Sequence, residues 1–197
     1  MGRVSKAQAT RNRQSVVEGA ARLFQQHGLK GIAIADLMAE AGLTHGGFYR
    51  QFASKDEVAG EACAHSMQRA VQHWQSIAAR HPPETCVSAI ADAYLTANPA
   101  THRCPMPMLA ADVAREAPGS PVRAAFTGGV ADLANVLTAC LPDAENLPDA
   151  ADAPPRRERA LGLLAALVGA VALARATDDE TFSNDIRNAV RHLAAAL

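Results

Sequence analysis

Residues 34–50, IADLMAEAGLTHGGFYR, are the stretch that decides the fold expected from this sequence. Apolar residues recur there at helical spacing over barely two turns, at Ile34, Leu37, Met38 and Ala41. A helix this short is stable only when it packs on neighbouring helices. Gly42 supplies a tight turn, and Thr44 can cap a third short helix that ends near Arg50. Two short helices around such a turn predict a helix-turn-helix.

Longer amphipathic helices are expected on both sides of this pair. The helix before it starts from a Thr10 cap and stops at Gly28. Its apolar stripe consists of Val16, Val17, Ala20, Ala21, Leu23 and Phe24. The helix after the pair starts from a Ser54 cap and continues to about Arg80. At roughly 1.5 Å per residue it is about 40 Å long, enough to connect two domains.

Prolines divide the remainder of the chain into further helices. Pro82 and Pro83 end the long helix and open the next one. Three prolines prevent a continuous helix over residues 98–107, and the acidic stretch 142–155 is expected to be a surface loop. The other helices are expected at residues 106–116, 121–141, 156–176 and 180–197. Because 49% of the residues are hydrophobic and only 4% are aromatic, we predict an all-α fold of about nine helices with a core of Ala, Leu and Val.

Charge distribution, cysteine spacing and the length of the apolar runs indicate the partners and the cellular location to expect. Residues 1–56 hold eight basic and four acidic residues, whereas the rest holds eleven and sixteen, so a basic end is joined to an acidic body. That arrangement suits a protein whose first segment meets a polyanion. The dispersed cysteines and the polar N-terminus without a signal peptide predict reduced thiols and a cytoplasmic location. The uncharged run 160–174 has 15 residues, fewer than the roughly 18 that span a bilayer, so we expect a buried helix and no membrane contact.

Residues 28–55 also form a pattern that resembles the DNA-binding signature of the TetR/AcrR family of transcriptional regulators. The matching residues are Gly28-Leu29-Lys30-Gly31, Ile34-Ala35-Asp36-Leu37-Met38, Ala41-Gly42-Leu43-Thr44, Gly46-Gly47-Phe48-Tyr49, Phe52 and Ser54-Lys55. The resemblance covers about residues 10 to 60. It implies a three-helix helix-turn-helix DNA-binding domain at 1–54 and an effector-binding and dimerisation domain at 55–197.

The resemblance assigns phosphate contacts to three residues. Thr44, Tyr49 and Lys55 would hold phosphates of double-stranded operator DNA, Lys55 with help from the N-terminal end of the helix that follows it. Arg50 is expected to touch a phosphate or a base edge. A basic N-terminal tail would follow the backbone or enter a minor groove, or would simply be solvated; its residues are Arg3, Lys6, Arg11 and Arg13.

The recognition helix also needs residues that face the bases. His45, Gly46 and Gly47 fit this requirement, since small residues let the backbone approach DNA and hydrogen-bonding residues read base edges. Phe48 and Phe52 are four apart and are expected to be core residues facing the two preceding helices. The chain departs from the family pattern before residue 34, where a usual Ser or Thr is missing. A helix cap worth about 1 kcal/mol is therefore absent there.

The final two helices resemble the dimerisation pair of the family. The helix containing residues 160–174 is apolar on nearly every side, so it must be covered all round. One face would pack on its own subunit and another on a second copy. We therefore expect a homodimer whose paired recognition helices meet successive major grooves. A monomer with this helix at its centre is the alternative.

The resemblance further implies a cavity for a small-molecule effector among the fourth to seventh helices. Its candidate lining residues are Met67, Trp74, Tyr94, Cys104, Met106, Met108 and Phe126. Each of these is also suited to the core. Methionines beside a proline-interrupted bend would nevertheless suit a cavity that accepts varied apolar molecules. The sequence does not identify the effector.

Cys104 differs from the other three cysteines. Cys63, Cys86 and Cys140 lie on apolar helical stripes and are expected to be packing residues. Cys104 follows His102 and Arg103 and precedes a helix start, and positive charge there would favour a reactive thiolate. The alternative is an unreactive loop cysteine.

These patterns predict a ligand-responsive DNA-binding repressor that a small molecule releases from its operator. A redox or electrophile sensor acting through Cys104 is an alternative, and so is a helical protein-interaction module. An enzyme is not expected, because the sequence shows no nucleophile elbow, H-E-x-x-H pair or phosphate loop. No cofactor is predicted, and no metal, since His102 and Cys104 alone are too few ligands. Operator sequence, target genes and the choice between repression and activation stay open.

Overall fold

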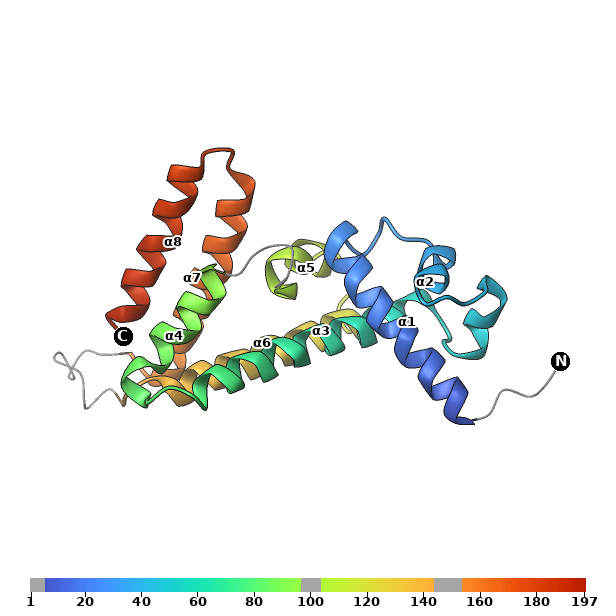
Figure 1. The fold of residues 1–197 in the computed structure, drawn as a ribbon, viewed down its shortest axis with the longest axis horizontal. Helices are drawn as coiled ribbons and strands as arrows, with labels where there is room; N and C mark the ends of the chain where they lie inside the picture. The colour runs from blue at the N-terminus through green and yellow to red at the C-terminus, as the bar shows by residue number, and fades with distance from the viewer. Residues whose placement is uncertain (1–5, 97–103, 144–153) are drawn as a thin grey trace. The chain divides into compact units, whose positions relative to one another are not determined.

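The computed structural model describes residues 6–96, 104–143 and 154–197. In these ranges the chain is helical and contains no strand, as Figure 1 shows. The elements are α1 (Lys6–His27), α2 (Ile34–Glu40), the 3-10 helix η1 (His45–Arg50), α3 (Lys55–Ala78), α4 (Pro83–Thr96), α5 (Pro105–Val113), α6 (Pro121–Cys140), α7 (Arg156–Ala176) and α8 (Glu180–Ala195). The predicted all-α fold of about nine helices is confirmed for the described part of the chain.

The helices form two compact units, which we describe separately. Unit 1 holds the described residues up to Gln68 and those from Cys104 to Gly129, and unit 2 holds those from Arg69 to Thr96 and from Val130 onward. The first parts of α3 and α6 therefore belong to unit 1 and their second parts to unit 2. The division into a DNA-binding domain at 1–54 and an effector domain at 55–197 stays a prediction.

Unit 1 is built around the helix-turn-helix. Its core contains apolar side chains from α1, α2, η1 and the start of α3: Val16, Ala20, Phe24, Leu37, Met38, Phe48, Phe52 and Val58. The rings of Phe48 and Phe52 lie 5.6 Å apart, so the expectation that both are core residues is confirmed. Because α2 and η1 are too short to be stable alone, this packing holds them in place.

Helix ends in unit 1 follow local signals with one exception. Gly28 and Gly42 have φ of +77° and +68°, the left-handed conformation that favours glycine, and they follow α1 and α2 as expected. The Ser54 Oγ accepts the Glu57 N–H at 3.1 Å, which confirms the cap of α3. The cap expected at Thr10 is wrong. Helix α1 already begins at Lys6, and the Thr10 hydroxyl donates to the Lys6 carbonyl at 3.1 Å inside the first turn.

Two glycines allow α3 and α6 to approach closely within unit 1. A Cβ on Gly60 would lie 2.7 Å from the Pro121 Cβ, and a Cβ on Gly129 would clash with the Met67 side chain. Contacts this short do not occur in well-packed interiors, so neither position can take a larger residue without moving a helix.

Gly129→Ala is expected to destabilise the protein by about 1–3 kcal/mol, because the added methyl group overpacks the contact with Met67. The matched control is Gly128→Ala in the same turn. A Cβ there meets nothing within 4 Å. The control should therefore stabilise the protein by about 0.5–1 kcal/mol through helix propensity. Urea unfolding measures both. Equal effects of the two substitutions would contradict the close approach.

Unit 2 is organised by the antiparallel pair α7 and α8, with α4 packed against both. The connection between the pair is held by hydrogen bonds: the Asp179 carboxylate accepts the Phe182 N–H at 3.0 Å, and the buried Ser183 hydroxyl donates to the Ala174 carbonyl at 3.0 Å. Arg191 of α8 joins α4 through Asp92 at 3.2 Å and Thr96 at 2.9 Å. The expected helical pair at the end of the chain is thus present.

A disulfide joins Cys86 in the first turn of α4 to Cys140 at the end of α6. The expectation that these two are reduced packing residues is therefore wrong for their redox state, although both side chains are buried. Their Cα atoms lie 5.6 Å apart, within the usual range for a disulfide. The two cysteines are 54 positions apart in the sequence, a separation at which pairing leaves no local pattern. Cys63 is buried and unpaired by any disulfide.

Candidate nucleic-acid interface

Helix η1 presents the residues that the sequence assigned to DNA. Thr44, His45, Tyr49 and Arg50 are exposed, and Phe48 points into the core. Tyr49 is 68% exposed, a large exposed fraction for an aromatic side chain. Thr44 occupies the N-cap position, but its hydroxyl makes no capping hydrogen bond, so the cap expected there is wrong. The short helix and its N-cap residue therefore expose hydroxyl, imidazole, phenol and guanidinium groups.

The two glycines of η1 are not equivalent. A Cβ on Gly46 would meet nothing within 4 Å, whereas a Cβ on Gly47 would lie 3.4 Å from the Met38 Cε. Gly46 is exposed and Gly47 is half-buried. A large residue at 47 would therefore press on α2 as well as on a bound partner. Gly46 is the position where the backbone can approach another surface without a neighbouring side chain.

Lys55 lies at the start of α3 beside this surface. Its half-buried ammonium donates to the Leu29 carbonyl at 3.0 Å, which ties α3 to the segment between α1 and α2. An ammonium group has three N–H donors, so this bond is compatible with a phosphate contact. The phosphate contact of Lys55 stays a prediction, and with it those of Thr44 and Tyr49.

Arg13 does not behave as part of a solvated basic tail. Its guanidinium lies 4.1 Å from the centre of the Phe52 ring, donates to the Gln51 carbonyl, and pairs with Glu57 at 2.6 Å and with Glu61. These contacts fasten α1 to η1 and α3. Hydrogen bonds from the Ala53 backbone and from Arg13 lower the pKa of Glu57, so the pair stays ionised at neutral pH.

Two of the other tail residues are exposed on α1, namely Lys6 and Arg11, while Arg3 lies outside the described residues. The start of α2 is also as expected. Ala33 occupies its N-cap position without a side-chain cap, and only the Asp36 carboxylate reaches back, accepting the Ala33 N–H at 2.9 Å. The missing cap is thus confirmed, and one half of a capping box compensates for part of it.

The candidate effector residues are divided between the two units. Trp74 and Tyr94 lie in unit 2, where both are buried and their rings meet edge to face at 5.6 Å. The others lie in unit 1. Met67 and Met106 are buried there, whereas Cys104, Met108 and Phe126 are half-buried. His102 and Arg103 lie outside the described residues. Within unit 2 the structure therefore brings Trp74 and Tyr94 together as an aromatic pair.

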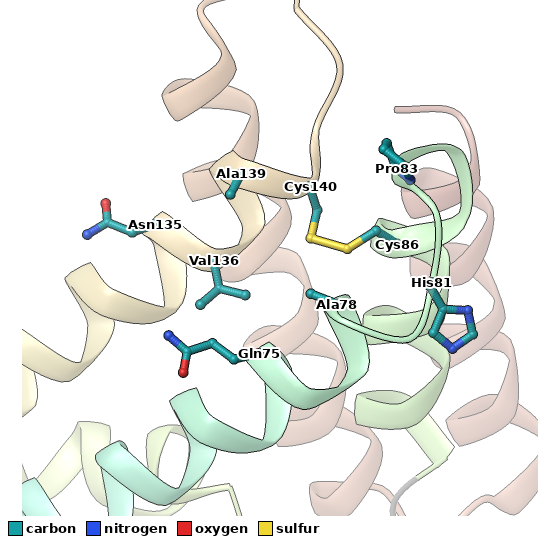
Figure 2. A pocket seen from close by; sticks show the side chains of 9 residues that line it. All are labelled: Gln75, Ala78, His81, Pro83, Cys86, Asn135, Val136, Ala139 and Cys140. Carbon is teal, nitrogen blue, oxygen red and sulfur yellow. A yellow bond between two sulfur atoms is a disulfide. The ribbon is translucent and has the colours of Figure 1, made fainter.

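Unit 2 contains a pocket that the sequence did not indicate. It has a volume of about 400 Å³ and lies among α3, α4 and α6 (Figure 2). The lining residues are Gln75, Ala78, His81, Pro83, Cys86, Asn135, Val136, Ala139 and Cys140. None of the candidate effector residues is among them. No titratable cluster able to hold a metal ion occurs among the described residues.

Comparison with known proteins places the helix-turn-helix in a family. Residues 16–62 match the model of the bacterial regulatory proteins of the tetR family. This segment includes α2, η1 and the start of α3, the elements that carry the exposed residues described above. No curated protein is similar enough in sequence to count as a relative.

Solved structures share the fold across almost the whole chain. A TetR-family regulator from Cytophaga hutchinsonii has a TM-score of 0.79 at 19% identity, with 100% of this chain and 98% of that chain covered. The reduced form of Escherichia coli NemR gives 0.76 at 18% identity, with 93% and 95% covered. A TetR regulator from Chloroflexus aurantiacus gives 0.73 at 23% identity, with 94% and 95% covered.

Four observations indicate the same kind of protein. They are the signature residues of the sequence, the exposed side chains of η1, the family match over the helix-turn-helix and the shared fold. Residues 16–62 therefore carry the helix-turn-helix of the bacterial regulatory proteins of the tetR family, the described chain shares the fold of TetR-family regulators, and the protein is a DNA-binding regulator of transcription.

Proposed function

We propose that this regulator is a cytoplasmic repressor that binds its operator as a homodimer and leaves it when a small molecule binds. The observation that carries the DNA-binding part is the outer face of η1, where Thr44, His45, Tyr49 and Arg50 are exposed around Gly46. This face offers phosphate donors beside groups that can read base edges. The regulator acts by binding and has no catalytic step.

The homodimer is supported by the apolar surface of the last two helices. Four of their large apolar side chains are exposed: Leu161 by 42%, Leu173 by 59%, Phe182 by 53% and Leu193 by 46%. Phe182 and Leu193 are eleven positions apart and so form an exposed apolar stripe along one face of α8. An exposed apolar face of this kind on a single subunit marks an interaction surface. We propose that α7 and α8 of a second copy cover it, as a two-fold axis requires.

Helix α7 has the length and composition of a membrane-spanning helix. Among the described residues it is the one helix long and apolar enough to cross a bilayer, and 44% of its most apolar window is buried. The core helix of a soluble protein meets the same criterion. Its packing against α8 and α4 supports a core helix with one face left for the partner subunit.

The phosphate and base contacts can be separated by substitution. Tyr49→Phe and Lys55→Ala are expected to weaken binding to specific and unspecific DNA alike, each by about 1 kcal/mol or roughly fivefold, because phosphates carry no sequence information. Lys55→Ala should also reduce the salt slope of binding by about 1. His45→Ala should instead change the preferred sequence. Fluorescence anisotropy at several salt concentrations measures these effects.

An unchanged affinity and salt slope for Lys55→Ala would contradict its phosphate contact. The matched control is Lys30→Ala, which removes an exposed charge from the segment before α2. Replacement of Gly47 by a large residue is expected to alter sequence preference too. Its contact with Met38 means that the fold of such a variant must be checked first.

Release through the Cys104 thiol is the second candidate mechanism, and the position of α5 favours it. Cys104 occupies the N-cap position of α5. At the other end of this helix, the Asp112 carboxylate accepts the Leu29 N–H at 2.9 Å, next to the end of α1. A modification at Cys104 would therefore act on a helix that contacts the helix-turn-helix.

We expect Cys104 to react first with a limiting thiol reagent. Burial raises the pKa of the Cys63 thiol to about 11, so that thiol stays protonated and unreactive at neutral pH. Mass spectrometry locates the label, and operator affinity is compared for wild type and Cys104→Ser. First labelling of another cysteine, or an equal response of Cys104→Ser, would leave the reversibly bound effector as the mechanism.

A further inference from the structure

The disulfide of unit 2 lies where solvent can reach it. Cys86 and Cys140 are 4% and 6% exposed, so neither residue is a surface cysteine. Both line the pocket of about 400 Å³, and Figure 2 shows the sulfur–sulfur bond between the last turn of α6 and the first turn of α4. Five of the other lining residues are exposed to solvent: Gln75, His81, Pro83, Asn135 and Ala139. The pocket is therefore a route from solvent to the disulfide.

The pocket also has the size and polarity for a small thiol. Its volume lies within the range of small-molecule sites. The side-chain amides of Gln75 and Asn135 and the imidazole of His81 line the pocket together with apolar residues. Groups of this kind can hydrogen-bond the polar body of a small thiol compound. Larger molecules, such as a folded protein, would not enter a site of this volume.

The proposed cellular location makes a permanent disulfide unexpected. Cytosolic thiols are kept reduced, and the disulfides found there are usually transient, catalytic or redox-sensing. A DNA-binding regulator operates in that compartment, so this step rests on the proposed cytoplasmic function. Reversible exchange needs two cysteines at bonding distance and access for the attacking thiolate, and the pocket beside Cys86 and Cys140 supplies that access.

We propose that Cys86 and Cys140 form a thiol–disulfide exchange site that takes a small-molecule thiol through the pocket of unit 2. The thiolate of one small molecule attacks one cysteine sulfur, forms a mixed disulfide and releases the other cysteine as a thiolate, which takes up a proton. A second small thiol attacks the mixed disulfide and frees the first cysteine. The products are two cysteine thiols and the disulfide of the small molecule, and the reverse reaction restores the bond.

The bond acts on the helices of the proposed dimer surface. It attaches the start of α4 to the end of α6, and α4 packs on α7 and α8. Arg191 of α8 binds Asp92 and Thr96 on the same helix α4. Reduction releases the first turn of α4 from α6 and leaves these later contacts in place. The reduced protein should therefore show faster hydrogen exchange in the first turns of α4.

The test uses the full chain and two reagents, dithiothreitol and oxidised glutathione. After treatment of the native protein, thiols are alkylated in denaturant and mapped by mass spectrometry. We expect Cys86 and Cys140 to be alkylated together after dithiothreitol and protected together after oxidised glutathione. Cys104→Ser should show the same cycle, which separates this pair from the Cys104 hypothesis. Two free thiols after oxidised glutathione, or a bond that dithiothreitol does not reduce in the native protein, would overturn the proposal.

Access through the pocket is tested by filling its rim. Gln75→Trp is expected to slow reduction of the native disulfide by about tenfold, because access controls the exchange rate. The control is Gln72→Trp, an exposed glutamine on the same helix that does not line the pocket. Equal rates for the two variants would overturn the pocket route. None of these measurements involves DNA, so they succeed or fail independently of the proposed operator binding.

Discussion

Leu173→Glu combined with Phe182→Glu is expected to convert the homodimer into monomers and to abolish specific operator binding. The two side chains are 59% and 53% exposed on one subunit, and the proposed interface buries both. Burial of a large apolar side chain contributes about 1.5–3 kcal/mol, and a buried unpaired carboxylate costs several more. Since the two-fold axis doubles each change, the loss should exceed about 5 kcal/mol, roughly a thousandfold or more in dimer affinity.

Sedimentation at micromolar concentration measures this change. The wild type should sediment at twice the 20.6 kDa chain mass and the double variant at the chain mass itself. Thr181→Glu is the control, because it adds the same charge beside Phe182 at an exposed position off the apolar stripe. A monomeric wild type with intact operator binding would contradict the proposed interface.

Phe48→Ala is expected to destabilise unit 1 by about 3–5 kcal/mol, the usual cost of removing a buried phenylalanine. Phe48 is fully buried, and it is the residue through which η1 attaches to the core. A helix of six residues cannot persist without that attachment. The variant should therefore lose the recognition surface together with stability, as urea unfolding and DNA binding will show.

Tyr49→Ala provides the matched comparison, because it removes a similar ring from the next residue, which is 68% exposed. We expect it to weaken DNA binding while changing stability by less than about 0.5 kcal/mol. If Phe48→Ala were no more destabilising than Tyr49→Ala, the orientation of η1 would be wrong.

Local signals in the sequence were sufficient for most of the fold. Prolines 83, 105 and 121 stand at the first residue of α4, α5 and α6, where the missing N–H costs nothing. Gly28 and Gly42 follow helices in the conformation that only glycine adopts readily. Each of these signals acts within one or two helical turns, so it can be recognised from the sequence alone.

Interactions between distant segments were not predictable in the same way. Arg13 pairs with Glu57 and Glu61, more than forty positions away, and the tail position of Arg13 suggested a DNA contact instead. One signal was available: the two glutamates are four apart and form a single acidic face on α3. The Cys86–Cys140 disulfide had no comparable signal, because each cysteine also fitted an apolar helical stripe.

The candidate site residues show the same difference between local signals and interactions of distant segments. Within η1 the sequence was sufficient to separate the buried Phe48 from its exposed neighbour Tyr49, since that distinction depends on a few adjacent residues. The effector residues required the packing of several helices, and the sequence pattern could not distinguish a pocket wall from a core position. The pocket of unit 2 is accordingly lined by residues to which the sequence pattern assigned no ligand-binding role.

The central claim is that the helix-turn-helix of this chain reads a specific operator as part of a two-fold dimer. Selection of bound sequences from random double-stranded DNA by the full-length protein tests it most directly. We predict enrichment of an inverted repeat whose half-sites are about one helical turn, roughly 34 Å, or a small multiple of it apart. Recovery of the unselected pool, with no sequence enriched, would contradict the claim.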